Sequence, residues 1–313
     1  MNIENDLSNI PTSLIQLLLR KMGLPSSFAN RDKMLLRINS FFQDGKLSYE
    51  DFINELRASE ECGSKIIYLK HILDFAALKD DKVVSQILDK LPAARGKALK
   101  TLKLPGNPTL NYKIFNENEI RIKFSETQTK FTEDYETLRL VPEDVTNVVV
   151  FSVNRQNGHS LIYFDTPNRR HSHTDENGHS SDLKYFNYYF EIFDDLFSEN
   201  QSVNLNAGIN SVLRMKPPIC IVRINTDIND FNTEARLKNK NLLEDLDFVA
   251  RVNDESRDKI NDYSAFTFLR QVSNKNLAEH VNVHIHPFQG IIKIPAKRLS
   301  SEVDYVISAV RKI

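Results

Sequence analysis

The hydrophobic pattern of this 313-residue chain changes from a helical to a strand-like period after about the first hundred residues. In residues 15–22, apolar side chains stand at i, i+3, i+4 and i+7, which places them on one face of a helix. In residues 120–124, apolar side chains instead alternate with arginine and lysine, which is the period of a half-buried strand. These two patterns, one after the other, predict an α+β fold. We expect a small all-helical N-terminal domain followed by a larger α+β domain with a mixed or antiparallel sheet.

The helical pattern extends over residues 1–92, which we expect to fold as one small domain. Within it, residues 65–75 are rich in Ile, Leu and Tyr, and periodicity does not decide between a strand and a helix there. Residues 93–113 combine proline, glycine and basic residues, which predicts a basic linker. Residues 114–313 then form the predicted α+β domain.

Several stretches of this second domain have the apolar content of strands, and others have the period of helices. We expect strands at 120–124, 148–153, 160–164, 219–224, 281–285 and 290–294, and helices at 183–197, 239–252 and 301–312. The helix at 183–197 is rich in Phe and Tyr but is flanked by acidic residues, which would repel phosphate. This composition favours packing in a core or against a protein partner over stacking with nucleic-acid bases.

Residues 12–42 have the pattern of two amphipathic helices joined by a Gly-Leu-Pro-Ser-Ser turn. Gly23 ends the first helix, because glycine enters the left-handed conformation without a Cβ clash. The second helix has apolar positions at Met34, Leu35, Ile38, Phe41 and Phe42.

This pattern resembles the SAP module, a small helix-turn-helix-like unit of DNA-binding proteins, over about 30 residues of the chain. The resemblance implies that the first turn of the second helix meets the DNA backbone. Asn30 stands where that family has a glycine. Asparagine tolerates the left-handed conformation better than most residues, so the module can accommodate it.

Basic residues are concentrated in the same part of the chain. Residues 1–113 carry 17 Lys and Arg against 13 Asp and Glu, whereas residues 114–313 carry 24 against 29. Residues 90–113 contain no acidic residue, so they could follow a phosphate backbone, or they could be a soluble linker. The candidate nucleic-acid contacts are Arg20, Lys21, Arg31, Lys33 and Arg37, with Lys97, Lys100 and Lys103 alongside. The alternative is that these side chains form the ordinary solvated faces of a helical bundle.

Two groups of histidines could bind a divalent metal such as zinc. His284 and His286 stand at i and i+2 of an expected strand and so share one face of it. His171 and His173 lie in the polar stretch 166–182, where acidic residues could complete a site. The alternatives are the water-facing side of an antiparallel strand and a solvated loop. No third ligand for His284 and His286 is identifiable from the sequence.

A further group of residues stands in the order that the acidic residues and the lysine have in one type of metal-dependent nuclease core. Asp165 follows an expected strand, and the triplet Asp182-Leu-Lys184 comes after it. Acid-x-Lys triplets are frequent by chance in a chain this rich in charge, and Lys184 opens an expected helix.

Several common sequence motifs are absent, and their absence disfavours some classes of function. The sequence has no G-x-G-x-x-G, Walker, G-x-S-x-G, H-E-x-x-H or C-x-x-C pattern, which disfavours common nucleotide hydrolysis, Rossmann redox chemistry and α/β-hydrolase chemistry. No apolar run approaches the ~20 residues that span a bilayer, and the first residues do not follow the plan of a signal peptide. With only Cys62 and Cys220, we expect a cytoplasmic protein in a reducing compartment.

We therefore expect a nucleic-acid-binding protein, above all a DNA-binding one, that acts without catalysis or a cofactor as part of a larger complex. One alternative is a protein-interaction scaffold that uses the helical domain and the aromatic helix to bind a partner or a second copy. The other is a metal-dependent hydrolase or nuclease that uses His284 and His286. None of these expectations involves a membrane.

Overall fold

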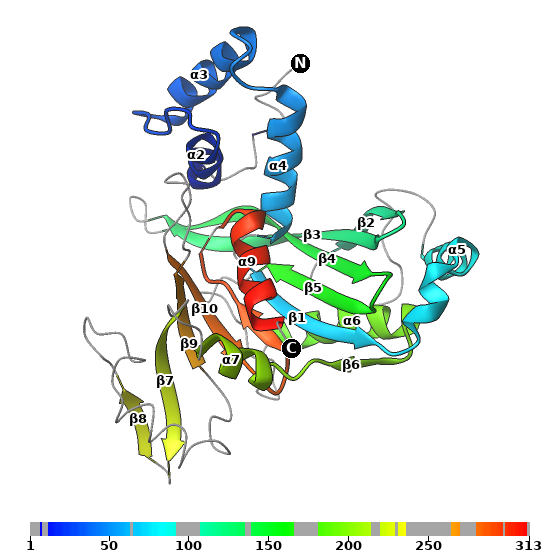
Figure 1. The fold of residues 1–313 in the computed structure, drawn as a ribbon. Helices are drawn as coiled ribbons and strands as arrows, with labels where there is room; N and C mark the ends of the chain where they lie inside the picture. The colour runs from blue at the N-terminus through cyan, green and yellow to red at the C-terminus, as the bar shows by residue number, and fades with distance from the viewer. Residues whose placement is uncertain are drawn as a thin grey trace. The chain divides into compact units, whose positions relative to one another are not determined.

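The computed structural model describes residue 7 and residues 12–62, 65–91, 107–134, 139–165, 181–213, 220–228, 231–235, 264–269, 280–296 and 298–311. The chain divides into two compact units, whose elements are labelled in Figure 1. Unit 1 consists of Met1–Ser64, Asn204–Phe288 and Ile292–Ile313, and unit 2 consists of Lys65–Val203 and Gln289–Ile291. Each unit therefore combines segments from separate parts of the sequence.

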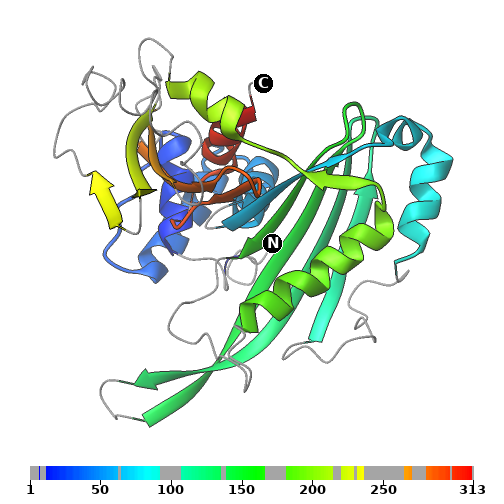
Figure 2. The same ribbon diagram turned by 90° about the horizontal axis from the view of Figure 1, so that it is seen from below.

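Unit 2 is built on an antiparallel sheet with strand order β2-β3-β4-β5-β1. The short strand β6 (Asn200–Ser202) pairs with β1. Figure 2 shows the strands side by side with α6 (Ser181–Leu196) lying over them, in roughly the same direction. The other strands are β1 (Lys65–Ile72), β2 (Asn107–Phe115), β3 (Glu119–Asp134), β4 (Arg139–Asn154) and β5 (His159–Asp165). The structure thus confirms an α+β fold with an antiparallel sheet.

The stretch that periodicity left undecided is the strand β1. Ile66 and Ile72 point to the face that carries α6, where they belong to the main hydrophobic cluster of unit 2. Ile67 and Leu69, which alternate with them, are also fully buried. Because β1 is buried on both faces, its sequence shows a continuous apolar run instead of alternation.

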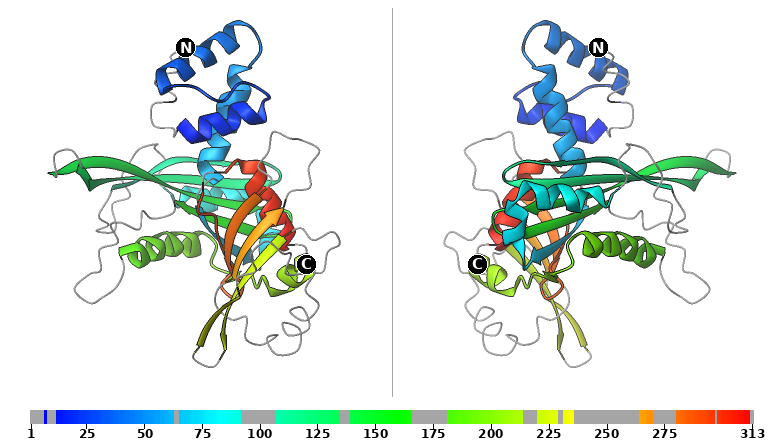
Figure 3. Two further views of the ribbon diagram at one scale, coloured as in Figure 1. Left: turned by 90° about the vertical axis from the view of Figure 1, so that its left-hand side faces the viewer. Right: turned by 90° about the vertical axis from the view of Figure 1, so that its right-hand side faces the viewer.

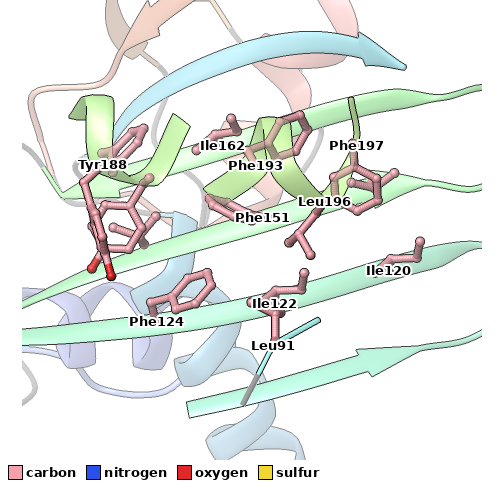
Figure 4. Packing of buried hydrophobic residues seen from close by; sticks show 14 of the residues in the cluster. Leu91, Ile120, Ile122, Phe124, Phe151, Ile162, Tyr188, Phe193, Leu196 and Phe197 are labelled. Atoms are coloured by element: carbon pink, nitrogen blue, oxygen red, sulfur yellow. The ribbon is translucent and has the colours of Figure 1, made fainter. Parts of the chain in front are cut away.

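The aromatic residues of α6 pack on the sheet. Tyr185, Phe186, Tyr188, Tyr189 and Phe193 are all buried. The ring centre of Phe186 lies 4.8 Å from that of Phe164 on β5. Figure 4 shows Phe193 above Phe151 of β4, with ring centres 5.3 Å apart. The interpretation of this helix as a core element is confirmed, so a partner could contact α6 only through its exposed residues, such as Asn187 and Glu191.

Burial of hydroxyls in this core affects their ionisation. Desolvation raises the pKa of Tyr68 on β1 to about 12. Desolvation and the nearby carboxylate of Glu126 on β3 raise the pKa of both Tyr188 and Tyr189. These tyrosines therefore remain neutral at physiological pH.

Arg155 joins the turn after β4 to η1 (Phe75–Lys79) and α5 (Asp81–Asp89). Its side chain is only 2% exposed. Its guanidinium donates to the carbonyl of Leu78 at 2.6 Å, to that of Lys79 at 3.1 Å and to a carboxylate oxygen of Asp81 at 2.6 Å. It also donates to the carbonyl of Asn116 in the turn between β2 and β3. One buried cation therefore holds three loops of unit 2 together.

Unit 1 contains segments from both ends of the chain. Its strands follow the order β10-β9-β7-β8, with antiparallel pairing of β10 with β9, β9 with β7 and β7 with β8. The strands are β7 (Cys220–Ile228), β8 (Phe231–Ala235), β9 (Ser264–Leu269) and β10 (His280–His286), and β11 (Ile291–Lys293) lies where the chain passes back from unit 2. The helices are α2 (Thr12–Lys21), α3 (Arg31–Gln43), α4 (Tyr49–Cys62), α7 (Asn206–Leu213) and α9 (Ser300–Arg311).

The N-terminal helices contact the C-terminal helix within unit 1. Leu299, which precedes α9, belongs to the same hydrophobic cluster as the buried residues of α2, α3 and α4. The backbone N–H of Ser300 donates to the hydroxyl of Ser59 on α4 at 3.4 Å. An all-helical domain over residues 1–92 is therefore not confirmed, because the helices before residue 64 group with C-terminal segments and β1 belongs to unit 2.

Glycine allows a close approach between α7 and α9. A Cβ on Gly208 would lie 1.6 Å from the carbonyl oxygen of Val310. No side chain fits in that space. The backbone of α7 at Gly208 therefore packs directly against the backbone of α9 at Val310.

Other expectations need correction or lie outside the described residues. The expected linker 93–113 includes the first part of β2, which starts at Asn107. The sequence did not indicate β8, β9 or α7. The helix expected at 239–252 lies outside the described residues.

Candidate functional site

The start of α3, where the resemblance to the SAP module predicts a DNA contact, is organised by Asn30. Its side chain accepts a hydrogen bond from the backbone N–H of Lys33 at 2.9 Å. Its φ of −154° is extended rather than left-handed. Asn30 therefore serves as an N-cap of α3, and not as a substitute for a left-handed glycine. The left-handed residue of this segment is Gly23, with a φ of 72°, at the end of α2 as expected.

Two of the predicted contact residues hold the helices of unit 1 together. The Arg31 guanidinium donates to the hydroxyl of Thr12 at 3.1 Å and to the backbone carbonyl of Leu7. Lys21, at the end of α2, forms an ion pair with Glu55 on α4. Both basic side chains are half-buried. Arg31 and Lys21 thus position α3 and α2 within the helical cluster.

Three other predicted contact residues, Arg20, Lys33 and Arg37, are exposed. Lys33 and Arg37 stand at i and i+4 on α3 and so lie on one side of the helix, together with Leu36, which is 68% exposed. Arg37 is supported from its own helix, because its guanidinium lies 5.0 Å from the ring centre of Phe41 and donates to the hydroxyl of Ser40 at 3.4 Å.

We call the residues Lys33, Leu36 and Arg37 the α3 face. Figure 3 shows α3 from two opposite sides. The exposed Asp32, next to Lys33, reduces the positive charge of the α3 face. Over residues 12–43, however, Asp32 is the sole acidic residue against five basic ones. The chemistry that this face offers is the attraction of a polyanion.

The basic residues of the expected linker fall into two groups. Lys97, Lys100 and Lys103 lie outside the described residues. Lys113 lies on β2, and its ammonium group donates at 2.6 Å to the carbonyl of Leu88 in the last turn of α5 and at 3.3 Å to that of Leu91, just after the helix. Lys113 therefore caps a helix C-terminus, where a cation is favourable.

The predicted metal ligands His284 and His286 lie on β10, as expected. Val281, Val283 and Ile285 are fully buried, and the two histidines alternate with them at half-buried positions. Within the described residues, no group of three or more His, Cys, Asp or Glu side chains is arranged to hold a metal ion. His171 and His173 lie outside the described residues.

Asp165, the first acid of the nuclease-like arrangement, is part of an ion pair. Its carboxylate lies 2.6 Å from the ammonium group of Lys65, whose side chain is fully buried. Its second oxygen accepts a hydrogen bond from the backbone N–H of Val148 at 2.5 Å. The pair joins the beginning of β1 to the end of β5, as their register requires. The side chains of Asp182 and Lys184 are outside the described part of the structure.

The structure also brings together two histidines that no sequence pattern connects. His71 on β1 and His159 on β5 are register partners, and their ring centres lie 5.4 Å apart. Each histidine stands alone in its own segment, so no spacing in the sequence links them.

Comparison of the sequence with known proteins found no family model and no curated protein that matches it. In the part of the chain that the structure describes, every helix is too short or too polar to span a bilayer.

Proposed function

We propose that the protein binds nucleic acid, DNA above all, through the α3 face and acts as a non-catalytic part of a larger complex. The observation that carries this proposal is that Lys33 and Arg37 are exposed on one side of a helix whose other side is buried. The two cations can each neutralise a phosphate and release its counterions, which is the main source of sequence-independent affinity. With two cysteines in the whole sequence, a reducing, cytoplasmic setting is part of the proposal.

The way α3 is held supports this role. The N-cap at Asn30 and the contacts of Arg31 fix the first turn of the helix, so Lys33 projects from a rigid element. Arg20 at the end of α2 adds a further exposed cation to the same helical cluster. Arg31 and Lys21 contribute to binding indirectly, because they hold the helices that carry the exposed cations.

Charge reversal on the α3 face tests the proposal. We expect Lys33→Glu combined with Arg37→Glu to weaken binding of a fluorescent DNA duplex, measured by anisotropy between about 50 and 200 mM salt. The slope of log affinity against log salt should fall by about 2, one for each lost phosphate contact. Circular dichroism of the variant shows whether α3 remains folded.

A matched variant separates this effect from a change in overall charge. Lys46→Glu combined with Lys82→Glu changes the charge by the same amount at exposed positions that are not part of the α3 face. We expect it to keep most of the affinity and the salt dependence of the wild type. Equal losses in the two double variants, or no loss in the first, would show that the α3 face is not the binding surface.

A further inference from the structure

Two imidazoles face each other across adjacent strands of unit 2. His71 on β1 stands directly opposite His159 on β5 in the antiparallel register, and the two rings meet edge to face at 65° with centres 5.4 Å apart. Both side chains are half-buried. Leu69 and Leu161, the next pair inward on this face, are buried, and Leu73 on the outward side is 51% exposed. The histidine pair therefore lies at the border between the covered and the open part of the sheet.

The backbone pairing brings these two histidines close together. The N–H of Ile72 donates to the carbonyl of Gly158 at 2.9 Å, so Ile72 and Gly158 form a hydrogen-bonded pair of the ladder. The adjacent pair, His71 and His159, is then a non-hydrogen-bonded pair, in which the Cα atoms approach to about 4.5 Å. By contrast, His284 and His286 are successive same-face residues of one strand, about 6.8 Å apart. The strand pairing therefore holds the imidazoles of His71 and His159 next to each other from two adjacent strands.

Local features favour a ligand at this position. Nδ1 of His71 is buried and has no hydrogen-bond partner among the described residues. On the other side of His71, β6 places Gln201 opposite it in the register, and Gln201 is exposed. Gly158 keeps the turn before β5 tight, because a Cβ there would lie 2.4 Å from the carbonyl oxygen of Ile72. The result is a row of nitrogen and oxygen donors across β6, β1 and β5.

We propose that His71 and His159 bind a divalent transition-metal ion of the kind that imidazole prefers, with Zn²⁺ as the reference ion. Imidazole nitrogen is a ligand for Zn²⁺, Cu²⁺ and Ni²⁺ rather than for Mg²⁺ or Ca²⁺. Two protein ligands leave the remaining coordination positions to water or to the Gln201 side chain. Such a site has fewer protein ligands than a closed structural zinc site, which has four. The proposal does not depend on nucleic-acid binding.

Titration of the full-length protein with Zn²⁺ by calorimetry tests the site. We expect one saturable site in the wild type and a loss of affinity of at least about tenfold in His71→Ala and in His159→Ala. The matched control is His284→Ala combined with His286→Ala, which removes the pair that the sequence singled out and should leave this site intact.

A second measurement needs no variant. One equivalent of Cu²⁺ added to the wild type should give an electron paramagnetic resonance spectrum with coupling to two imidazole nitrogens. The proposal is overturned if the wild type shows no saturable site, if the His71→Ala, His159→Ala double variant keeps full affinity, or if only the His284 and His286 variant loses it. Circular dichroism of each variant distinguishes loss of the site from loss of the fold.

Discussion

The two units provide clear examples of two different roles of basic side chains. In unit 2, Lys65 and Arg155 are almost completely buried and bind groups of their own unit, and Lys113 caps a helix end. In unit 1, Lys33 and Arg37 are exposed on α3. A buried, paired cation cannot bind a partner unless it gives up its internal contacts, whereas an exposed one can. Among the described residues, the candidates for binding a polyanion are therefore the exposed basic side chains, and not the buried, paired ones.

The same division exists inside the helical cluster of unit 1. Arg31 and Lys21 hold helices together, and Lys33 is two residues from Arg31 on the same helix. Of two basic residues that are close in sequence, one can therefore hold helices together while the other is exposed to solvent. Substitutions that measure stability and binding side by side can test this comparison between buried and exposed cations.

The largest effect on stability is expected for Arg155→Ala in unit 2. Removal of this side chain leaves the carbonyls of Leu78, Lys79 and Asn116 without their charged donor, in a place where water has little access. We expect the free energy of unfolding to fall by about 3–5 kcal/mol. Urea denaturation followed by far-ultraviolet circular dichroism measures it.

Arg121→Ala is the control for Arg155→Ala. Arg121 on β3 pairs with Glu119 at 2.8 Å, and both side chains are partly exposed, so the loss should stay below about 1 kcal/mol. If both variants lost the same free energy of unfolding, burial would not determine how much these cations of unit 2 contribute to stability.

An intermediate loss of stability, equal in the two units, is expected when a side chain that caps a helix N-terminus is removed. Asn30 caps α3 in unit 1, and Asp80 caps α5 in unit 2, where its side chain accepts from the N–H of Lys82 at 2.8 Å. Each change to alanine should cost about 1 kcal/mol. Asn30→Gly should cost only a few tenths, because glycine is itself an acceptable N-cap. A clear gain in stability from Asn30→Gly, seen in the same urea experiment, would contradict the N-cap role and favour a left-handed residue.

Local periodicity was sufficient to predict the elements whose two sides differ. The helices α2, α3 and α9 and the strands β3 and β10 each bury one face, so their sequences show the period directly. Periodicity does not identify the strand β1, because both of its faces are buried. Proline and glycine near the start of β2 predict a linker there, although proline is acceptable near the end of an outer strand.

The contacts of the candidate sites depend on pairing between distant segments. His71 meets His159, and Lys65 meets Asp165, only because β1 and β5 pair in one particular register. Neither segment by itself shows which strand it pairs with, so the sequence points to His284 and His286, whose spacing is visible along the chain. In the same way, the sequence identified Arg31 and Lys33 as equivalent cations, and only the packing of α3 against Thr12 and Leu7 separates their roles.

The smallest effect on stability is expected for Lys33→Ala combined with Arg37→Ala. Both side chains are exposed, alanine is at least as good a helix former, and the contacts of Arg37 with Ser40 and Phe41 are peripheral. The free energy of unfolding should change by no more than about 0.5 kcal/mol. Lys21→Ala combined with Arg31→Ala, with the same change in charge, should lose clearly more, because these side chains join helices. If the urea midpoints of the two double variants coincide, the distinction between structural and exposed cations in unit 1 fails. If they differ as expected, a loss of DNA affinity in the Lys33 and Arg37 variants can be assigned to the surface itself.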